Sequence, residues 1–146
     1  MIHELIKVLD EKLEIYKLEK DEENIYIYCN TKKMKQYCPY CTNISENVHS
    51  KYTRTIADLP IQNYKVKLII NVKKYFCNNK NCKHTTFAEP LEFVAKNAIR
   101  TKRLDDYINK VGLFNSSLTA QKQLADSHIK ISNNTILRVV KKTKNT

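Results

Sequence analysis

Two short segments with paired cysteines organise this chain: Cys38-Pro39-Tyr40-Cys41 and, farther along, Cys77-Asn78-Asn79-Lys80-Asn81-Cys82. Each segment holds two thiols close together in sequence, and 35 residues separate the two pairs. Zinc prefers four soft ligands at the corners of a tetrahedron, about 2.3 Å from each sulfur. The pattern therefore predicts a zinc-ribbon-like site with Cys38, Cys41, Cys77 and Cys82 as ligands. Because protein would fill all four positions, we expect the Zn²⁺ to be structural rather than catalytic.

The cysteines allow two other interpretations. Cys29 has no close cysteine partner, so we interpret it as a small buried apolar residue. An odd number of cysteines and the lack of a secretory signal favour metal or free thiols in a reducing cytosol over disulfides. Cys38-Pro39-Tyr40-Cys41 alone also matches the active-site tetrapeptide of glutaredoxins. No helical apolar period follows Cys41, however, and a redox role would leave the second pair unexplained.

The net charge of +11 is unevenly distributed along the 146 residues. Residues 1–36 have a net charge of −1, whereas residues 37–100 and 101–146 each have +6. This distribution predicts a polyanionic partner, with nucleic acid as the first candidate, although a basic surface without a partner is the alternative. No stretch of about 18 apolar residues occurs, so we expect no membrane span.

The region before the helices is expected to be rich in strands. Residues 2–10 have the spacing of a short amphipathic helix, and residues 12–30 that of a β-hairpin, which gives an N-terminal domain over 1–36. In the zinc-binding domain, 37–92, apolar residues alternate with mostly polar ones in a strand that leads toward the second cysteine pair: Val66, Leu68, Ile70 and Val72. Asp58-Leu59-Pro60-Ile61 predicts a turn or a strand end.

From about residue 93 the apolar period becomes helical, which predicts a third domain over 93–146. Gly112 is the only glycine in the chain, and we expect it to cap or interrupt the first helix. Ser116 or Ser117 can cap a second helix over roughly 118–127, and Ser132 a third. The whole is expected to be α+β, with a small β-rich zinc-ribbon-like domain followed by a three-helix helix-turn-helix domain.

The third helix has the composition of a DNA recognition helix. In a helix-turn-helix the N-terminal part of this helix enters the major groove. Asn can pair with adenine, Arg with guanine and Lys with phosphates. The candidate DNA contacts are Asn133, Asn134, Thr135, Arg138, Lys141 and Lys142, to which we add Lys51 and Arg54 from the zinc-binding domain. A plain three-helix bundle with a solvated basic face is the alternative.

Several short motifs occur in an order that resembles the ISL-three family of bacterial insertion-sequence transposases. They are Cys38-Pro39-Tyr40-Cys41, Val48-His49-Ser50-Lys51-Tyr52-Thr53-Arg54-Thr55, Asp58-Leu59-Pro60-Ile61, Tyr75-Phe76-Cys77 with Cys82, Thr86-Phe87-Ala88-Glu89, and Ile131-Ser132-Asn133-Asn134-Thr135-Ile136-Leu137-Arg138. The resemblance implies a zinc-binding module and a helix-turn-helix that recognise the terminal inverted repeats of the transposon. It also implies a bacterial cytoplasmic location at the nucleoid.

In the family, a catalytic domain with three carboxylates and divalent metal cuts and joins the DNA. No acidic residue follows Asp126, so we expect this catalytic domain to be absent and the chain not to be an enzyme. The expected partner is double-stranded DNA at transposon ends, with a homo-oligomer or the full-length transposase as possible protein partners. The alternative function is that of a truncated transposase that inhibits transposition through protein–protein contact.

Overall fold

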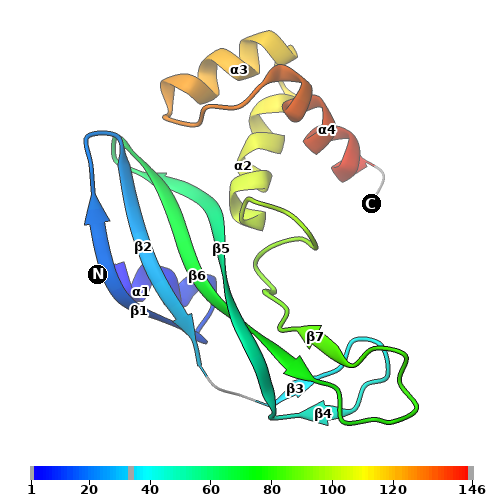
Figure 1. The fold of residues 1–146 in the computed structure, drawn as a ribbon. Helices are drawn as coiled ribbons and strands as arrows, with labels where there is room; N and C mark the ends of the chain where they lie inside the picture. The colour runs from blue at the N-terminus through cyan, green and yellow to red at the C-terminus, as the bar shows by residue number, and fades with distance from the viewer. Residues whose placement is uncertain (1, 33–34, 145–146) are drawn as a thin grey trace. The chain divides into compact units, whose positions relative to one another are not determined.

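The computed structural model describes residues 2–32 and 35–144 (Figure 1). As expected, the chain is α+β, and in its described part it contains four helices in all. The elements in chain order are α1 (Ile2–Leu9), β1 (Leu13–Lys20), β2 (Asn24–Thr31), β3 (Gln36–Tyr37), β4 (Ile44–Ser45), β5 (Val48–Ile61), β6 (Tyr64–Phe76), β7 (Thr86–Ala88), α2 (Lys102–Leu113), α3 (Ser117–Asp126) and α4 (Asn133–Lys144).

The long strands form one sheet in the order β1-β2-β6-β5, and the short strand β7 pairs with β6. A separate two-stranded sheet joins β3 and β4, with Tyr37 opposite Ile44. The predicted N-terminal helix and hairpin are confirmed as α1, β1 and β2. The cysteine pairs thus lie in loops at the ends of strands, the first between β3 and β4 and the second between β6 and β7.

Strand β6 buries different faces along its length. The predicted alternation is confirmed, because Val66, Leu68, Ile70 and Val72 are all buried. After Val72 the pattern changes: Tyr75 is fully buried, whereas Phe76 is 43% exposed. Successive side chains of a strand point to opposite faces, so the last part of β6 turns the other face toward a core. This change supplies the apolar base of the second cysteine pair.

The chain divides into two compact units, which are described separately. Unit 1 consists of Met1–Leu18, Ile27–Thr55 and Leu68–Glu92, and unit 2 of Glu19–Tyr26, Ile56–Lys67 and Phe93–Thr146. The boundaries fall inside β1, β2, β5 and β6, so each long strand contributes residues to both units.

Unit 1 contains a buried polar network beside its apolar core. The Nζ of Lys73 donates to the Thr31 carbonyl oxygen at 2.7 Å, and the Thr31 hydroxyl donates to Glu89 Oε1 at 2.5 Å. The backbone N–H of Lys73 donates to the same carboxylate oxygen at 3.0 Å. All three residues are buried, and their hydrogen bonds offset the cost of removing polar groups from water. The network attaches the segment after β7 to β2 and β6.

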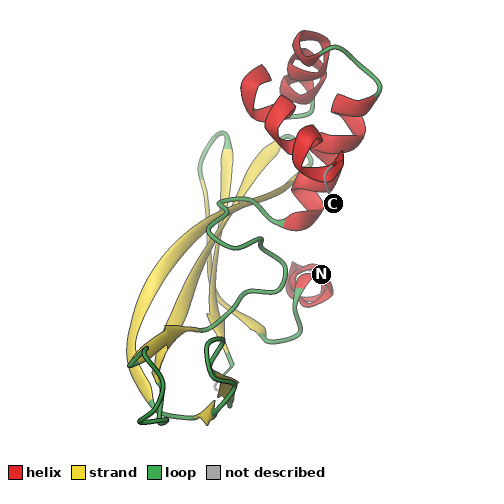
Figure 2. Cartoon of the chain, turned by 90° about the vertical axis from the view of Figure 1, so that its right-hand side faces the viewer, coloured by secondary structure: helices red, strands yellow, loops and turns green. Residues whose placement is uncertain are grey.

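Unit 2 is built around three helices, α2, α3 and α4, which gather in one group in Figure 2. Their buried side chains form one cluster: Leu104, Ile108, Ala120, Leu124, Ile129, Ile136 and Val139. Ala57 and Leu59 of β5 pack against this cluster. The helical fold therefore includes residues that lie far upstream of the helices in sequence.

Asp58 fixes the start of α2 in unit 2. Asp58 is 5% exposed, and its carboxylate accepts hydrogen bonds from the Thr101 hydroxyl at 2.8 Å and from Arg103 Nε at 2.8 Å. Arg103 Nη2 also pairs with the second carboxylate oxygen, and this partner raises the pKa of the guanidinium. Thr101 is in turn the N-cap of α2, accepting from the Leu104 N–H at 3.3 Å. The predicted strand end at Asp58-Leu59-Pro60 is thus an anchor for a helix.

Gly112 does not end or interrupt α2, contrary to our expectation. It lies within the helix, whose C-cap is Phe114. A Cβ atom at Gly112 would lie 2.8 Å from Val140 Cγ2 and 3.0 Å from Ile136 Cγ2, both on α4. The glycine is therefore required by the close approach of α2 and α4 rather than by a turn.

Replacing Gly112 by leucine is expected to destabilise unit 2 by about 3 kcal/mol, since overpacking a closed contact forces side chains and backbone to shift. Urea denaturation followed by the helical circular dichroism signal measures this. Lys110→Leu is the matched control, because it adds the same side chain to α2 at an exposed position. Equal denaturation midpoints for the two variants would contradict the prediction.

Candidate metal centre and nucleic-acid interface

The four predicted zinc ligands lie together. The Sγ atoms of Cys38, Cys41, Cys77 and Cys82 are all within 4.8 Å of one another, and those of Cys41 and Cys77 are 3.5 Å apart. A tetrahedral zinc with bonds of about 2.3 Å requires sulfur–sulfur distances of about 3.8 Å. Cys38 is buried and the other three cysteines are half-buried. Four thiols at this spacing are a donor set that fits a structural Zn²⁺.

The first cysteine loop is closed by backbone hydrogen bonds. The N–H of Thr42 donates to the Cys38 carbonyl at 2.8 Å, and the N–H of Cys38 donates to the Asn43 carbonyl at 2.8 Å. Thr42 has a φ of 65°, in the left-handed region, which turns the chain sharply after Cys41. This turn places both thiols of the loop on the same side.

The second loop is wider but is closed in a similar manner. The N–H of Cys77 donates to the Thr85 carbonyl at 2.8 Å, and the N–H of Cys82 donates to the Asn79 carbonyl at 3.1 Å. Inside the loop, the N–H of Asn81 donates to Asn79 Oδ1 at 3.0 Å, an Asx turn that tightens the chain. The four intervening residues therefore still bring Cys82 back to Cys77.

Three of the cysteines share a local arrangement that stabilises a thiolate. The sulfurs of Cys41, Cys77 and Cys82 each accept a backbone N–H from two residues further along, on Asn43, Asn79 and His84 respectively. For Cys41 this hydrogen bond is the main reason that the pKa is lowered to about 6. Such backbone donors orient metal ligands and stabilise their charge.

The cluster does not hold four negative charges by itself. The Asn79 N–H lowers the pKa of Cys77, but desolvation and the thiols of Cys41, Cys38 and Cys82 outweigh it and raise the pKa to about 12. The pKa of Cys82 is also raised, although the His84 N–H opposes this. A divalent cation would remove this mutual repulsion, and its binding must release the remaining protons.

Zinc binding is expected to release fewer than four protons at pH 7.5, because the pKa of about 6 leaves Cys41 largely deprotonated whereas that of about 12 keeps Cys77 protonated. As the pH falls through 6, Cys41 takes up a proton, so one more proton is released per zinc and the affinity falls more steeply. Calorimetric titration in two buffers of different ionisation enthalpy, at pH 7.5 and pH 5.5, counts these protons. Release of four protons at pH 7.5 would contradict the lowered pKa of Cys41.

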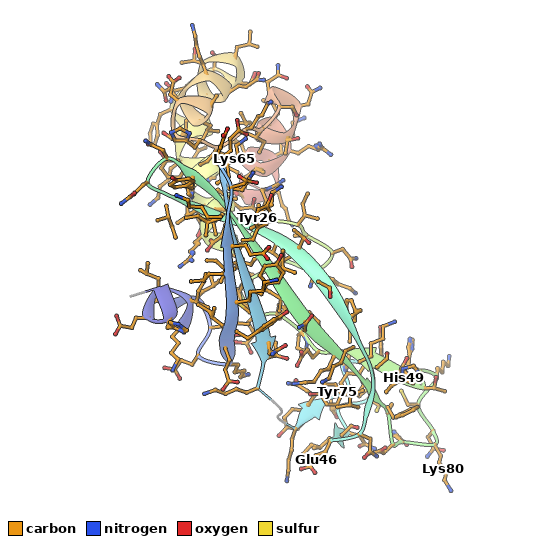
Figure 3. The ribbon with its side chains drawn as sticks, turned by 60° about the vertical axis from the view of Figure 1, so that its left-hand side comes forward. Tyr26, Glu46, His49, Lys65, Tyr75 and Lys80 are labelled. Carbon is orange, nitrogen blue, oxygen red and sulfur yellow. The ribbon has the colours of Figure 1, made fainter. Side chains whose placement is uncertain are left out.

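The cluster rests on an apolar base. Cys38, Tyr75 and Phe87 form a buried cluster, against which Val48 and the other three ligands pack. The rings of Tyr75 and Phe87 are stacked, with centroids 5.7 Å apart and planes at 18°. Figure 3 shows Tyr75 on β6, at the end of unit 1 that also holds β3 and β4. Two of the short sequence motifs therefore correspond to the support beneath the thiols.

Neither nearby histidine is placed as a fifth ligand. The ring of His84 contacts that of Tyr40, with centroids 3.5 Å apart, and the ring of His49 contacts Phe76 at 4.8 Å. A glutaredoxin-like thiol would require a helix after the first cysteine, and the chain after Cys41 instead enters the strand β4.

Comparison with known proteins agrees with this geometry. Residues 34–82 match the family described as the zinc-finger of transposase IS204/IS1001/IS1096/IS1165, and the match includes all four cysteines. This segment is similar to the zinc finger of those transposases, and it is called the zinc finger below. The resemblance to ISL-three transposases is thus confirmed for the zinc-binding part, and a four-thiol cluster in such a finger supports a structural Zn²⁺. No curated protein and no solved structure matches the chain significantly.

Beyond the zinc finger, α4 carries most of the candidate DNA contacts. Asn134, Arg138, Lys141 and Lys142 are exposed, and Asn133 and Thr135 are half-buried. The helix is capped by Ser132, whose hydroxyl accepts from the Thr135 N–H at 3.2 Å. Arg138 Nη2 donates to Thr135 Oγ1 at 3.1 Å. This bond directs the guanidinium toward the N-terminal half of the helix.

The connection between α3 and α4 spans residues 127–132. His128 in this connection has a φ of 63°, a left-handed conformation that turns of this kind often assign to glycine. Ile129 is buried in the helical cluster, and Ile131 packs against it. The two isoleucines therefore fix the connection to the core of unit 2.

The two candidate contacts in the zinc finger, Lys51 and Arg54, lie on β5. Lys51 is exposed and Arg54 is half-buried. They are three positions apart in a strand, so their side chains point to opposite faces of the sheet. The structure thus does not bring these two residues together.

A groove of about 590 Å³ beside α4 contains cations that the sequence analysis missed. Arg100 and Lys102 line it together with Arg138 and Lys142, and Asp105 and Asp106 line it as well. The Nε of Arg100 lies 2.7 Å from Asp105 Oδ1, so this guanidinium is already positioned. The three cations at 100, 102 and 103, directly before a helical period, were the available signal.

Separately, none of the helices among the described residues is long and apolar enough to span a membrane.

Proposed function

We propose that this chain is the zinc-stabilised DNA-binding part of a transposase and recognises the terminal inverted repeats of its transposon. The observation that carries the proposal is the zinc finger, similar to that of transposases and with its four clustered thiols, in a chain whose last helix exposes only uncharged and basic side chains. We infer that the chain acts in the bacterial cytoplasm at the nucleoid, where its DNA target lies.

In this proposal, α3 and α4 are the two helices of a helix-turn-helix and α4 is the recognition helix. The support is that α4 has a capped N-terminus, a buried face formed by Ile136 and Val139, and an exposed side of amides and cations that also includes Leu137. A helix of this kind fits the major groove, where base edges can be distinguished. A six-residue connection is longer than the usual 3–4-residue turn, and the buried Ile129 offsets its flexibility.

The proposed contacts divide according to chemistry. Asn133, Asn134 and Thr135 would meet base edges at the start of α4, and Arg138 a guanine. Phosphates would be bound by the cations Lys141, Lys142, Lys51 and Arg54, to which the groove adds Arg100 and Lys102. In this proposal the chain binds DNA, and the cutting chemistry belongs to a catalytic domain outside it.

Arg138→Ala is expected to cost about 1–3 kcal/mol in binding to inverted-repeat DNA and to reduce discrimination against a scrambled duplex. Lys122→Ala, on the exposed side of α3, is the matched control and should change affinity little. Gel-shift titration of both duplexes at moderate salt measures the two affinities. Equal binding of inverted-repeat and scrambled DNA by the wild-type chain would rule out specific recognition.

A second candidate is inhibition of a full-length transposase through protein contact. The observation that favours it is α1, where Leu5 is 44% and Val8 is 81% exposed in an acidic N-terminal region. Co-expression with the full-length transposase, followed by size-exclusion chromatography, tests this candidate. Separate elution of the two chains would argue against it.

A further inference from the structure

Three exposed aromatic rings in the zinc finger have no role in its core. Tyr37 is 65% exposed, Tyr40 58% and Phe76 43%. Each ring immediately precedes a zinc ligand, namely Cys38, Cys41 and Cys77. The thiol cluster therefore determines where these rings are held, while the rings themselves remain accessible to solvent.

Neighbouring side chains hold the rings in place. The Tyr40 ring packs against the His84 ring with centroids 3.5 Å apart and planes tilted by 54°, and the rings of Phe76 and His49 pack edge to face at 4.8 Å. Tyr37 is paired with Ile44 across the β3–β4 sheet. Rings ordered in advance lose little conformational entropy when a planar ligand stacks on them.

The surroundings of the rings are strongly basic. Residues 35–55 and 68–88 contain one acidic residue, Glu46, which lies 3.5 Å from Lys35 Nζ. The remaining exposed cations are Lys51, Lys74, Lys80 and Lys83. Lys80 extends outward from the second cysteine loop in Figure 3. Four thiolates around one Zn²⁺ would have a net charge of −2. The four positive charges of these lysines outweigh it, so the zinc finger attracts a polyanion.

We propose that the exposed rings Tyr37, Tyr40 and Phe76 bind unpaired bases of single-stranded DNA by stacking, with Lys80 and Lys83 holding the phosphates. This inference rests on the proposed function, because it takes DNA as the partner and adds a second form of it. Exposed aromatic rings interleaved with cations are the usual means of binding single strands, since every base has a face on which a ring can stack.

Duplex DNA fits these rings less well. The bases of a duplex are stacked on one another, so their faces are not available to a protein ring. The described residues of the zinc finger, 35–82, contain strands and loops but no helix that could enter the major groove. The single-strand surface on the zinc finger is therefore distinct from the duplex-reading helix α4.

Binding of a labelled oligothymidylate of about 12 nucleotides, within known single-strand site sizes, tests the proposal by fluorescence anisotropy with the full zinc-loaded chain. The double variant Tyr40→Leu/Phe76→Leu is expected to bind about ten-fold more weakly or worse. Tyr40→Phe is the control, because it keeps the ring and should retain the affinity. With nine tyrosines and no tryptophan, the chain should also show quenched tyrosine fluorescence on binding.

Zinc content is measured for each variant. If the double variant loses its metal, Tyr37→Leu is used for the binding test instead, because residue 37 lies outside both cysteine loops. Wild-type affinity for oligothymidylate in a zinc-retaining ring variant would overturn the proposal. Equal losses of single-strand and duplex affinity in that variant would also overturn it. Arg138→Ala separates duplex recognition by α4 from single-strand binding by the rings. It should weaken duplex recognition and leave oligothymidylate binding unchanged, so each of the two proposals can fail without the other.

Discussion

Replacing Asp58 by alanine is expected to lower the free energy of unfolding of unit 2 by about 3 kcal/mol, because removing one partner of a buried ion pair leaves the other without compensation. The loss includes both bonds from Arg103 and the bond from the Thr101 hydroxyl, which itself caps α2. Arg103 is 31% exposed and regains some hydration, which places the expected cost at the lower end of the range for buried pairs.

Urea denaturation monitored by the helical circular dichroism signal measures this loss. Asp106→Ala is the matched control, since it removes an exposed carboxylate from α2 and should shift the midpoint little. Asp58→Asn keeps an acceptor for Thr101 and should lie between the two. If Asp58→Ala and Asp106→Ala have the same stability, the anchoring role of Asp58 is wrong.

Replacing Cys82 by serine is expected to abolish stoichiometric zinc binding and to unfold the zinc finger. In small zinc domains the binding free energy, about 10–16 kcal/mol in zinc-finger peptides, is folding free energy. The base of Tyr75 and Phe87 is small and does not replace this contribution. His84→Ala is the control, because the His84 backbone N–H toward Cys82 survives the substitution and only the ring is lost.

Metal analysis of the purified variants, and titration of the wild-type chain with a thiol reagent before and after chelation, measure the outcome. Burial raises the pKa of Cys29 to about 12, so this thiol should stay unreactive in the folded chain. Chelation should then expose the thiols of the cluster alone. Wild-type zinc affinity in Cys82→Ser, or loss of zinc in His84→Ala, would contradict the assignment of ligands.

The features that could be predicted from sequence depend on short spacings. The cysteine loops bring their thiols together through turns of a few residues, and the alternation of Val66, Leu68, Ile70 and Val72 follows from one buried strand face. The third helix was similarly signalled by Ser132 and the apolar period after it. In each case the physical cause is local, so the sequence pattern contains it.

The features that were missed depend on contacts between distant residues. Asp58 meets Thr101 and Arg103 across more than 40 positions, and Gly112 is explained only by Val140 and Ile136 on another helix. A glycine in a helical pattern is normally taken as a cap, and no local signal distinguishes a close helix contact from a helix end. The positive φ of His128 was likewise missed, because only a few per cent of non-glycine residues adopt that conformation and the enrichment of histidine there is too weak to single out one position.

The interleaving of the two units limits how the gene can be divided. The boundaries at 55/56 and 67/68 lie within β5 and β6, so a cut between residues 92 and 93 would separate α2, α3 and α4 from Ala57, Asp58 and Leu59. A recombination event that exchanged only the helices would therefore join them to a β5 that had not been selected to hold them. For the same reason, an engineered change of DNA target should replace side chains on α4 rather than transplant the helical segment.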